Sequence, residues 1–223
     1  MSRNIDFSIN EYYHLYNRGV DKRTVFMDAE DYKRFTALLY LANNTNSVHM
    51  NNLNHRGLTS LDVLSIEKGD TLVDIGAYCL MPNHFHVLVR EKIESGISIF
   101  MQKVMTGYTM YFNKKYKRTG ALFGGTFKAQ HVARDTYLKY LFAYIHLNPI
   151  KLVDSNWKEN GISDKKKAER YLNSYLYSSY LDFKGTDREE KSILNKDAFP
   201  QYFSTNVEFR SFVSWWLNFK DEK

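Results

Sequence analysis

The stretch that most constrains the fold of this chain is residues 81–90, which read MPNHFHVLVR. Side chains of an extended strand alternate between two faces, so His84 and His86 share one face while the apolar residues beside them share the other. The apolar face predicts a strand buried against a core. The other face brings two imidazoles together, and such a pair can chelate one divalent metal. A lone His-x-His also occurs on solvated strand faces and is by itself a weak sign of a metal site. The interpretation as a metal site needs further ligands from elsewhere in the chain.

A predicted helix over residues 135–147 carries the residue types that such a site lacks. The helix is expected to begin with Asp135 as its cap and to end at Asn148 and Pro149. Tyr144 and Asn148 are four residues apart, so their side chains lie on one helix face. An amide oxygen is a suitable ligand for a hard divalent metal, and a tyrosine hydroxyl is a competent nucleophile once it is activated. Placed against the histidine pair, this face completes a three-ligand site with a nucleophile beside it.

The same helix also has a purely structural interpretation. Tyr137, Tyr140 and Tyr144 can form a stripe that packs in a core, and Asn148 can act as a C-terminal cap. The residues of the helix alone leave both interpretations open. If the helix is catalytic, Tyr140 is a second candidate nucleophile, because it lies one turn before Tyr144.

The charge and aromatic content of the chain favour a nucleic-acid partner. Its 223 residues carry a net charge of +6, with 17 tyrosines and 15 phenylalanines. Cations contact phosphates and aromatic rings stack on unpaired bases, although a basic protein with a tyrosine-rich core would have the same composition. The cations around residue 115 also suit the end of a helix, where they complement its dipole. The candidate phosphate contacts are Arg18, Lys114, Lys115, Lys117, Arg118 and Lys128.

The sequence predicts a cytoplasmic protein without a membrane partner. No stretch approaches the roughly 20 apolar residues of a membrane span. The first residues, MSRNID, lack the apolar region of a signal peptide. Cys79 is the only cysteine, so no intrachain disulfide can form, and this suits a reducing compartment.

Hydrophobic periodicity and turn residues predict the remaining elements. Strands are expected over 9–17, 71–80 and 122–132, with a hairpin between the second of these and the histidine strand, and helices over 29–42 and 95–116. Asn-rich residues from about 43 to 70 are expected to form a long loop with a short element near 61–66. Residues 150–183 are expected to form a charged linker and then an aromatic packing segment. The apolar end of the chain predicts a terminal helix that docks on the core or on a second subunit.

Four stretches, in this order, resemble the single-tyrosine HUH transposases, and most of all the REP-associated tyrosine transposases. They are residues 12–19 (YYHLYNRG), 81–87 (MPNHFHV), 120–123 (GALF) with Phe127-Lys128, and 144–149 (YIHLNP). Residues 177–180 (YSSY) resemble a further family motif more weakly. Thr126 departs from the family's pattern, which has an arginine at this position.

This resemblance implies an α+β fold: an antiparallel sheet with helices packed on one face, in the split βαβ arrangement of ferredoxin-like and RRM-like domains. A helical C-terminal extension would follow it, so that residues 1–150 form the catalytic domain and residues 151–223 the extension. The resemblance also implies that His84, His86 and Asn148 hold a divalent metal, Mg²⁺ or Mn²⁺, beside the nucleophile Tyr144. Its implied partners are single-stranded DNA, at hairpin or repeat ends, and a second copy of the chain in a homodimer.

The resulting hypothesis is metal-dependent cleavage and strand transfer of single-stranded DNA through a 5′-phosphotyrosine intermediate. One alternative is a catalytically silent or domesticated nucleic-acid-binding protein derived from such a transposase. Another is a metal-dependent hydrolase built on His84 and His86. That alternative is weaker, because a hydrolase needs a carboxylate as ligand or base and none adjoins the pair in the sequence.

Overall fold

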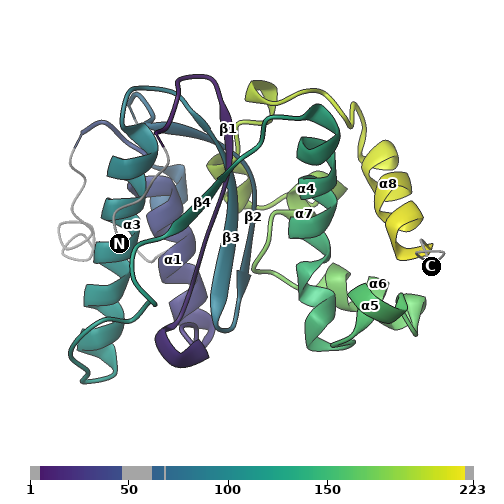
Figure 1. Cartoon of the computed structure of the whole chain (residues 1–223), viewed down its shortest axis with the longest axis horizontal. Coiled ribbons are helices and arrows are strands. Elements are labelled where there is room, and N and C mark those ends of the chain that lie inside the picture. Colours follow the sequence, from purple (N-terminus) through teal and green to yellow (C-terminus); the bar gives the residue numbers. More distant parts are fainter. Residues whose placement is uncertain (1–5, 47–61, 68, 219–223) are drawn as a thin grey trace.

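The computed structural model describes residues 6–46, 62–67 and 69–218 and shows a four-stranded antiparallel sheet in the order β2-β3-β1-β4. In the first β-α-β unit, strands β1 and β2 are separated by β3, and in the second unit, strands β3 and β4 are separated by β1. This interleaving is the predicted split βαβ fold (Figure 1). The strands are β1 (Tyr12–Arg18), β2 (Val73–Met81), β3 (His84–Glu91) and β4 (Lys128–His131).

Helices cover both faces of this sheet, with α1 and α3 on one side and α4 and the later α-helices on the other (Figure 1). The α-helices are α1 (Ala29–Leu41), α3 (Gly96–Lys115), α4 (Asp135–Leu147), α5 (Trp157–Asn160), α6 (Lys165–Ser174), α7 (Tyr180–Lys184) and α8 (Asn206–Asn218). Short 3₁₀ helices are η1 (Val20–Lys22), η2 (Asp62–Ser65), η3 (Asn148–Leu152), η4 (Glu189–Ile193) and η5 (Lys196–Ala198). Of the helices in the described ranges, none is both long enough and apolar enough to cross a bilayer.

The side of the sheet that faces α1 and α3 is a closed apolar core. Phe85 and Val87 of β3 are completely buried there, and the Phe85 ring lies 5.0 Å from that of Phe35 on α1. Helix α1 starts where the sequence predicts, because the Asp28 carboxylate accepts a hydrogen bond from the Asp31 amide. Alternation along β3 therefore turns every second side chain into this core and leaves the histidines on the opposite face.

The opposite side of the sheet packs against α4 and the C-terminal helices. Ala77, Cys79 and Leu88 of the sheet belong to one buried cluster with residues of these helices. Helix α8 contacts α4 and α7 and buries Phe209 and Val213 against them. The predicted terminal helix therefore exists, and in this structure it docks on the chain's own core.

Several predicted boundaries were wrong for local reasons. β1 starts at Tyr12 rather than residue 9, because Asn10 has a positive φ of 67° and turns the chain. The strand expected over 122–132 is shortened to β4, since Gly125 adopts a φ of 101° that interrupts extended pairing. Asp135 does not cap α4: Arg134 holds that position without a side-chain hydrogen bond, and Asp135 accepts one from the Tyr202 hydroxyl.

The segment expected to be a charged linker is folded into α5, α6 and α7. In α6 the lysines of residues 165–167 face solvent while Ala168 and Leu172, four residues apart, are buried. The long loop predicted near 43–70 contains the expected short element as η2, and its residues 47–61 and 68 lie outside the described part of the chain.

Candidate active site

The two histidines of β3 face α4 and sit opposite polar residues of β1. His84 pairs across the strands with Arg18, and His86 pairs with Tyr16. Directly opposed residues of an antiparallel pair project from the same face. The ring centroids of His84 and His86 are 5.0 Å apart, so the strand alternation gives the spacing predicted from the sequence.

A hydrogen bond fixes the orientation of the His84 ring. Its Nδ1 lies 2.6 Å from Asn83 Oδ1, and the Asn83 amide is held in turn because its Nδ2 donates to the Lys22 carbonyl at 3.1 Å. Asn83 Oδ1 can only accept, so the imidazole proton resides on Nδ1. The Nε2 lone pair of His84 is then available for another ligand.

The His86 ring is held by a third histidine, which the sequence reasoning missed. His86 Nδ1 lies 2.9 Å from Nε2 of His14 on β1, and both side chains are buried. Either ring can donate in this pair. When His86 donates from Nδ1, its Nε2 has a free lone pair and can bind a metal. His14 belongs to the first motif of the resemblance, but its contact with His86 depends on the register between β1 and β3, which the sequence does not show.

All three imidazoles are neutral at neutral pH. Burial lowers the pKa of His14 to about 4, assisted by the nearby Lys158 charge. Burial also lowers the pKa of His84 to about 4, with Arg18 as the next cause. The pKa of His86 is well below its usual value through burial and the neighbouring His14 and His84. A metal binds the neutral imidazole, so these shifts favour the binding form.

Helix α4 brings its predicted pair against the histidines. The Tyr144 ring centroid lies 5.4 Å from that of His86 and 5.9 Å from that of His14, edge-on to both. Asn148 is buried, and its side chain lies close enough to His84 to affect the pKa of that imidazole. Its Nδ2 also lies 3.5 Å from the Tyr144 carbonyl, an arrangement that leaves Oδ1 as the donor atom for a metal.

The donor set formed by these residues fits a divalent metal. It combines two neutral imidazoles with one amide oxygen, and each histidine has its other nitrogen in a hydrogen bond, as metal-bound histidines usually do. Within the described ranges no cluster of three or more His, Cys, Asp or Glu side chains is placed to hold a metal.

The second residue that the sequence reasoning missed is Lys158. Its Nζ lies 3.8 Å from the centroid of the Tyr144 ring, a cation–π contact. Burial, and then repulsion from Lys151, lower the pKa of Lys158 to about 8. Lys158 lies on α5, in the segment expected to be a linker, so nothing in its sequence context marked it as part of the site.

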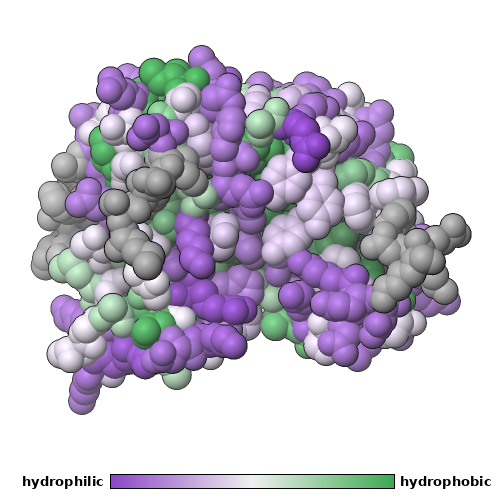
Figure 2. All heavy atoms as spheres, in the orientation of Figure 1, coloured by the Kyte–Doolittle hydropathy of each residue, from purple (hydrophilic) through white to green (hydrophobic). Residues whose placement is uncertain are grey.

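A cavity of about 320 Å³ adjoins the histidines and Tyr144. Its remaining lining residues come from β1, β4 and α4 and are Tyr16, Gln130, Tyr137, Tyr140 and Leu141. In Figure 2 the surface between β4 and α4 is pale, the colour of side chains with intermediate hydropathy such as tyrosine.

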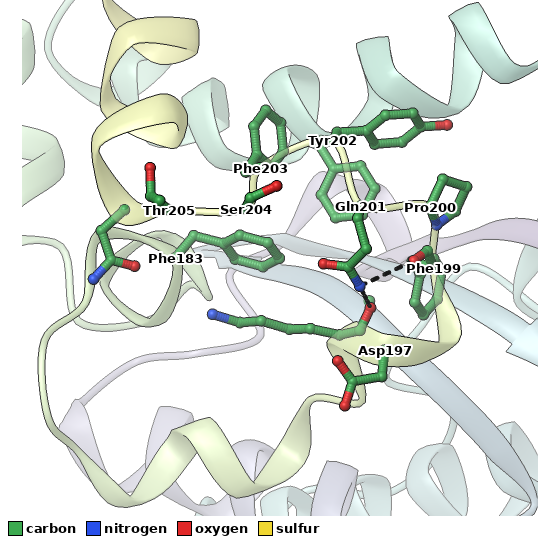
Figure 3. Close-up of a pocket in the computed structure, with 13 residues that line it drawn as sticks. Phe183, Asp197, Phe199, Pro200, Gln201, Tyr202, Phe203, Ser204 and Thr205 are labelled. Atoms are coloured by element: carbon green, nitrogen blue, oxygen red, sulfur yellow. Dashed lines mark hydrogen bonds between the residues drawn. The ribbon is translucent and has the colours of Figure 1, made fainter.

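A second cavity, of about 210 Å³, lies among residues 196–206 with Phe142 and Phe183 (Figure 3). The Lys196 ammonium at this cavity donates to the Asp182 carbonyl at 2.8 Å and lies 4.2 Å from the Phe183 ring centroid. None of the site residues predicted from the sequence lines this second cavity, so the chemistry is to be sought at the first.

The six predicted phosphate contacts separate into two groups. Arg18 and Lys128 lie on the histidine side, opposite His84 and Tyr16 respectively. The other four, Lys114, Lys115, Lys117 and Arg118, lie at or just after the end of α3, on the other side of the sheet. Among these, Lys115 is held in ion pairs with Asp28 and Asp31 at 2.7 and 2.8 Å, and Arg118 donates to Asn113 at 3.0 Å.

Comparison with known proteins agrees with this geometry. Residues 62–148 match the family model described as "Transposase IS200 like", whereas no curated protein matches. A solved REP-associated tyrosine transposase bound to a REP hairpin shares the fold, with a TM-score of 0.52 and 10% identity over 92% of this chain and 96% of that one. A tRNA(His) guanylyltransferase from Saccharomyces cerevisiae is also similar, at a TM-score of 0.38 and 9% identity over 90% and 86%, too low to carry an argument.

The fold is thus similar to that of a tyrosine transposase, with a histidine pair on a central strand of the sheet and a tyrosine-bearing helix beside it. Residues 62–148, which include both histidines and Tyr144, are similar to the IS200-like transposase family.

Proposed function

We propose that this protein cleaves and rejoins single-stranded DNA with Tyr144 as the nucleophile and a divalent metal as cofactor. The observation that carries the proposal is the contact between α4 and β3. It brings Tyr144 within 5.4 Å of His86, measured between ring centroids, in a chain whose family match spans both residues.

His84, His86 and Asn148 would hold the metal, with Mg²⁺ or Mn²⁺ as the proposed ion. Bound there, the metal would polarise a non-bridging oxygen of the scissile phosphate and lower the charge that the nucleophile meets. The chain's own contribution is to keep both imidazoles neutral and correctly turned, through burial and through the hydrogen bonds of His84 to Asn83 and of His86 to His14.

The reaction we propose is an in-line displacement at phosphorus. The Tyr144 oxygen forms a bond to phosphorus while the bond from phosphorus to the 3′ oxygen breaks. The phenol loses its proton and the leaving 3′ oxygen gains one, so the products are a 5′-phosphotyrosine and a free 3′-hydroxyl. No water enters, so the phosphoester remains activated and a 3′-hydroxyl can attack it to rejoin a strand.

Tyr144 suits this role better than Tyr140 does. The Tyr140 ring packs against Tyr144 at 6.0 Å and against Trp216 at 5.4 Å, one helical turn further from the histidines. Burial and the neighbouring Tyr144 raise the pKa of Tyr140, which disfavours the phenolate that a nucleophile needs. The Lys158 ammonium lies over the Tyr144 ring, where a cation can stabilise the negative charge that develops on a phenol oxygen during the attack.

The proposed substrate class is single-stranded DNA at hairpin or repeat ends. It rests on the family match over residues 62–148 and on a protein of similar fold that was solved with a REP hairpin. Arg18 and Lys128, beside the site, are the proposed phosphate contacts.

We propose the same division as the sequence suggests: residues 1–150 form the catalytic domain, and the extension 151–223 completes the site through Lys158. A cytoplasmic homodimer is also part of the proposal, and sedimentation at several concentrations tests the dimer.

The test is a covalent-adduct assay with Mg²⁺ or Mn²⁺ and labelled single-stranded hairpin DNAs on a denaturing gel. We expect a protein band that carries the label from the DNA 3′ of the cut. Tyr144→Phe removes only the hydroxyl and should abolish the adduct, while the matched control Tyr140→Phe should keep it. Binding of every hairpin without any adduct would instead favour the catalytically silent or domesticated binding protein, and a free 5′-phosphate product would favour the hydrolase.

A further inference from the structure

We propose that the cavity between β1, β4 and α4 is a nucleobase pocket, which holds the unpaired base next to the scissile phosphate. This inference rests on the proposed function, because it assigns a part of the same single-stranded substrate to a part of the protein. The cavity measures about 320 Å³, within the size range of small-molecule pockets.

The walls of the cavity are aromatic. The rings of Tyr137 and Tyr140 are 5.9 Å apart and nearly parallel, with an angle of 22° between their planes. Tyr16 forms another part of the wall, and its ring lies 6.0 Å from that of His86. Every nucleobase has a π face, so such walls accept a base by stacking.

The lining of the cavity contains no acidic side chain and no lysine or arginine. Its residues are tyrosines, two histidines, a glutamine and a leucine. A phosphate or a carboxylate would therefore find no ion-pair partner inside it. The cations that can hold the backbone, Arg18 and Lys128, project from the same face of the sheet but are not among the lining residues.

Gln130 of β4 adds a polar group at the rim. Its side chain is exposed, and it lines the cavity together with Tyr137. A carboxamide presents a donor and an acceptor together and can pair with the edge of a base. The pocket therefore combines a stacking surface with one group that can distinguish between bases.

The position of the pocket fixes which base it can take. His86 and Tyr144 belong both to the proposed reaction centre and to the cavity wall. A base in the cavity is thus attached to a nucleotide that adjoins the phosphate attacked by Tyr144. The pocket would set the register of the strand at the nucleophile and supply sequence preference at one position beside the cut.

The test measures DNA binding without a metal, so that no cleavage is needed for a result. The probes are fluorescent hairpins with single-stranded flanks that contain all four bases, and each flanking nucleotide is replaced in turn by an abasic one. An abasic nucleotide at one flanking position beside the cut should weaken DNA binding by the wild-type protein about tenfold to a hundredfold. Tyr137→Leu should weaken binding of intact DNA by a similar factor and leave binding of that abasic DNA unchanged. Gln130→Ala should reduce the difference among the four bases at that position.

Trp215→Leu is the matched control, because it removes an exposed aromatic residue of α8 and should change neither measurement. Circular dichroism checks that each variant is folded. Equal weakening of intact and abasic DNA by Tyr137→Leu, or no weakening at all, would overturn the pocket even if the covalent adduct forms. Wild-type protein could form no adduct while Tyr137→Leu weakens binding of intact DNA and not of the abasic DNA. That result would overturn the proposed cleavage and keep the pocket.

Discussion

The two faces of the sheet are built from the same strands and have opposite physical character. On the face toward α1 and α3, alternate residues of β3 such as Phe85 and Val87 are completely buried among aliphatic and aromatic side chains. On the face toward α4, the residues between them, His84 and His86, meet Tyr144, Asn148 and the ammonium of Lys158.

This contrast shows how the fold separates stability from chemistry within one strand. The apolar face gains free energy by removing large side chains from water. The polar face buries imidazoles in a state that favours a ligand, and it leaves a cavity beside them. Substitutions on the first face should therefore unfold the protein, and substitutions on the second should remove function from a folded protein.

The largest expected difference between the faces is in stability. Phe85→Ala should lower the free energy of unfolding by about 3–5 kcal/mol, because the buried ring leaves a cavity between α1 and the sheet. The neighbouring substitution His84→Ala, at a half-buried position, should lower it by less than about 1.5 kcal/mol and abolish the adduct. Urea denaturation measures both. Similar losses for the two variants would show that the faces are not separable in this way.

The next effect concerns His14, which contacts the proposed metal ligand His86 rather than the metal. His14→Phe removes the hydrogen-bond partner of His86 Nδ1 and should weaken Mn²⁺ binding about tenfold to a hundredfold. His14→Gln keeps an oxygen that can accept from Nδ1 and should restore part of the affinity. Calorimetric titration with Mn²⁺ decides this point, and equal affinity in wild type and His14→Phe would show that His14 only packs.

A smaller effect is expected at Lys158, where function and stability should move in opposite directions. Lys158→Met removes the cation from the Tyr144 ring and should slow adduct formation by about twofold to thirtyfold. The same variant should be more stable than wild type at pH 7, because burial lowers the pKa of Lys158 and so makes its charge unfavourable in the folded state.

The pH dependence of stability tests the effect of burying Lys158 independently. The pKa of Lys158 is about 8 in the folded protein, and its ordinary value is 10.5. Between these two pH values the unfolded chain keeps a proton on Lys158 that the folded protein has lost. Wild-type stability should therefore rise with pH across this window relative to Lys158→Met. Thermal melts of both proteins from pH 7 to pH 10 test it, and a constant difference would contradict the buried position of the ammonium.

The smallest expected effect separates the two groups of cations. Arg18→Ala should weaken DNA binding a few fold and reduce the slope of log affinity against log salt by about one. Lys115→Ala should leave binding unchanged and lower stability instead, since it removes the ammonium that forms an ion pair with the completely buried Asp31 carboxylate. Fluorescence anisotropy over a salt series measures the binding. Equal losses for the two variants would indicate that DNA also contacts the α3 side of the protein.

The sequence predicted the elements whose signals are local. The β2–β3 hairpin, α1 with its Asp28 cap, and the amphipathic helices α3 and α4 all follow from periodicity and capping residues. The placement of Tyr144 against the histidines required the additional assumption that α4 packs on the sheet, which came from the family resemblance.

The features that escaped prediction depend on contacts between distant segments. The pairing of His14 with His86 requires the register of β1 against β3, which no local pattern encodes. Lys158 reaches Tyr144 because α5 folds back over α4, and its charged surroundings in the sequence resemble a solvated linker. The strand expected over 122–132 begins only at Lys128, as β4, and this late start depends on the positive φ of Gly125, which the sequence permits but does not require.

Peptide mapping of the adduct shows directly whether Tyr144 itself becomes linked to DNA. Wild-type protein would be incubated with Mn²⁺ and hairpin DNA, digested with nuclease and trypsin, and analysed by fragmentation mass spectrometry. Trypsin releases residues 140–151 as one peptide that contains both candidate tyrosines. We expect a nucleotide remnant on Tyr144, with Tyr140 unmodified. A remnant on Tyr140, or on a tyrosine outside this peptide, would contradict it.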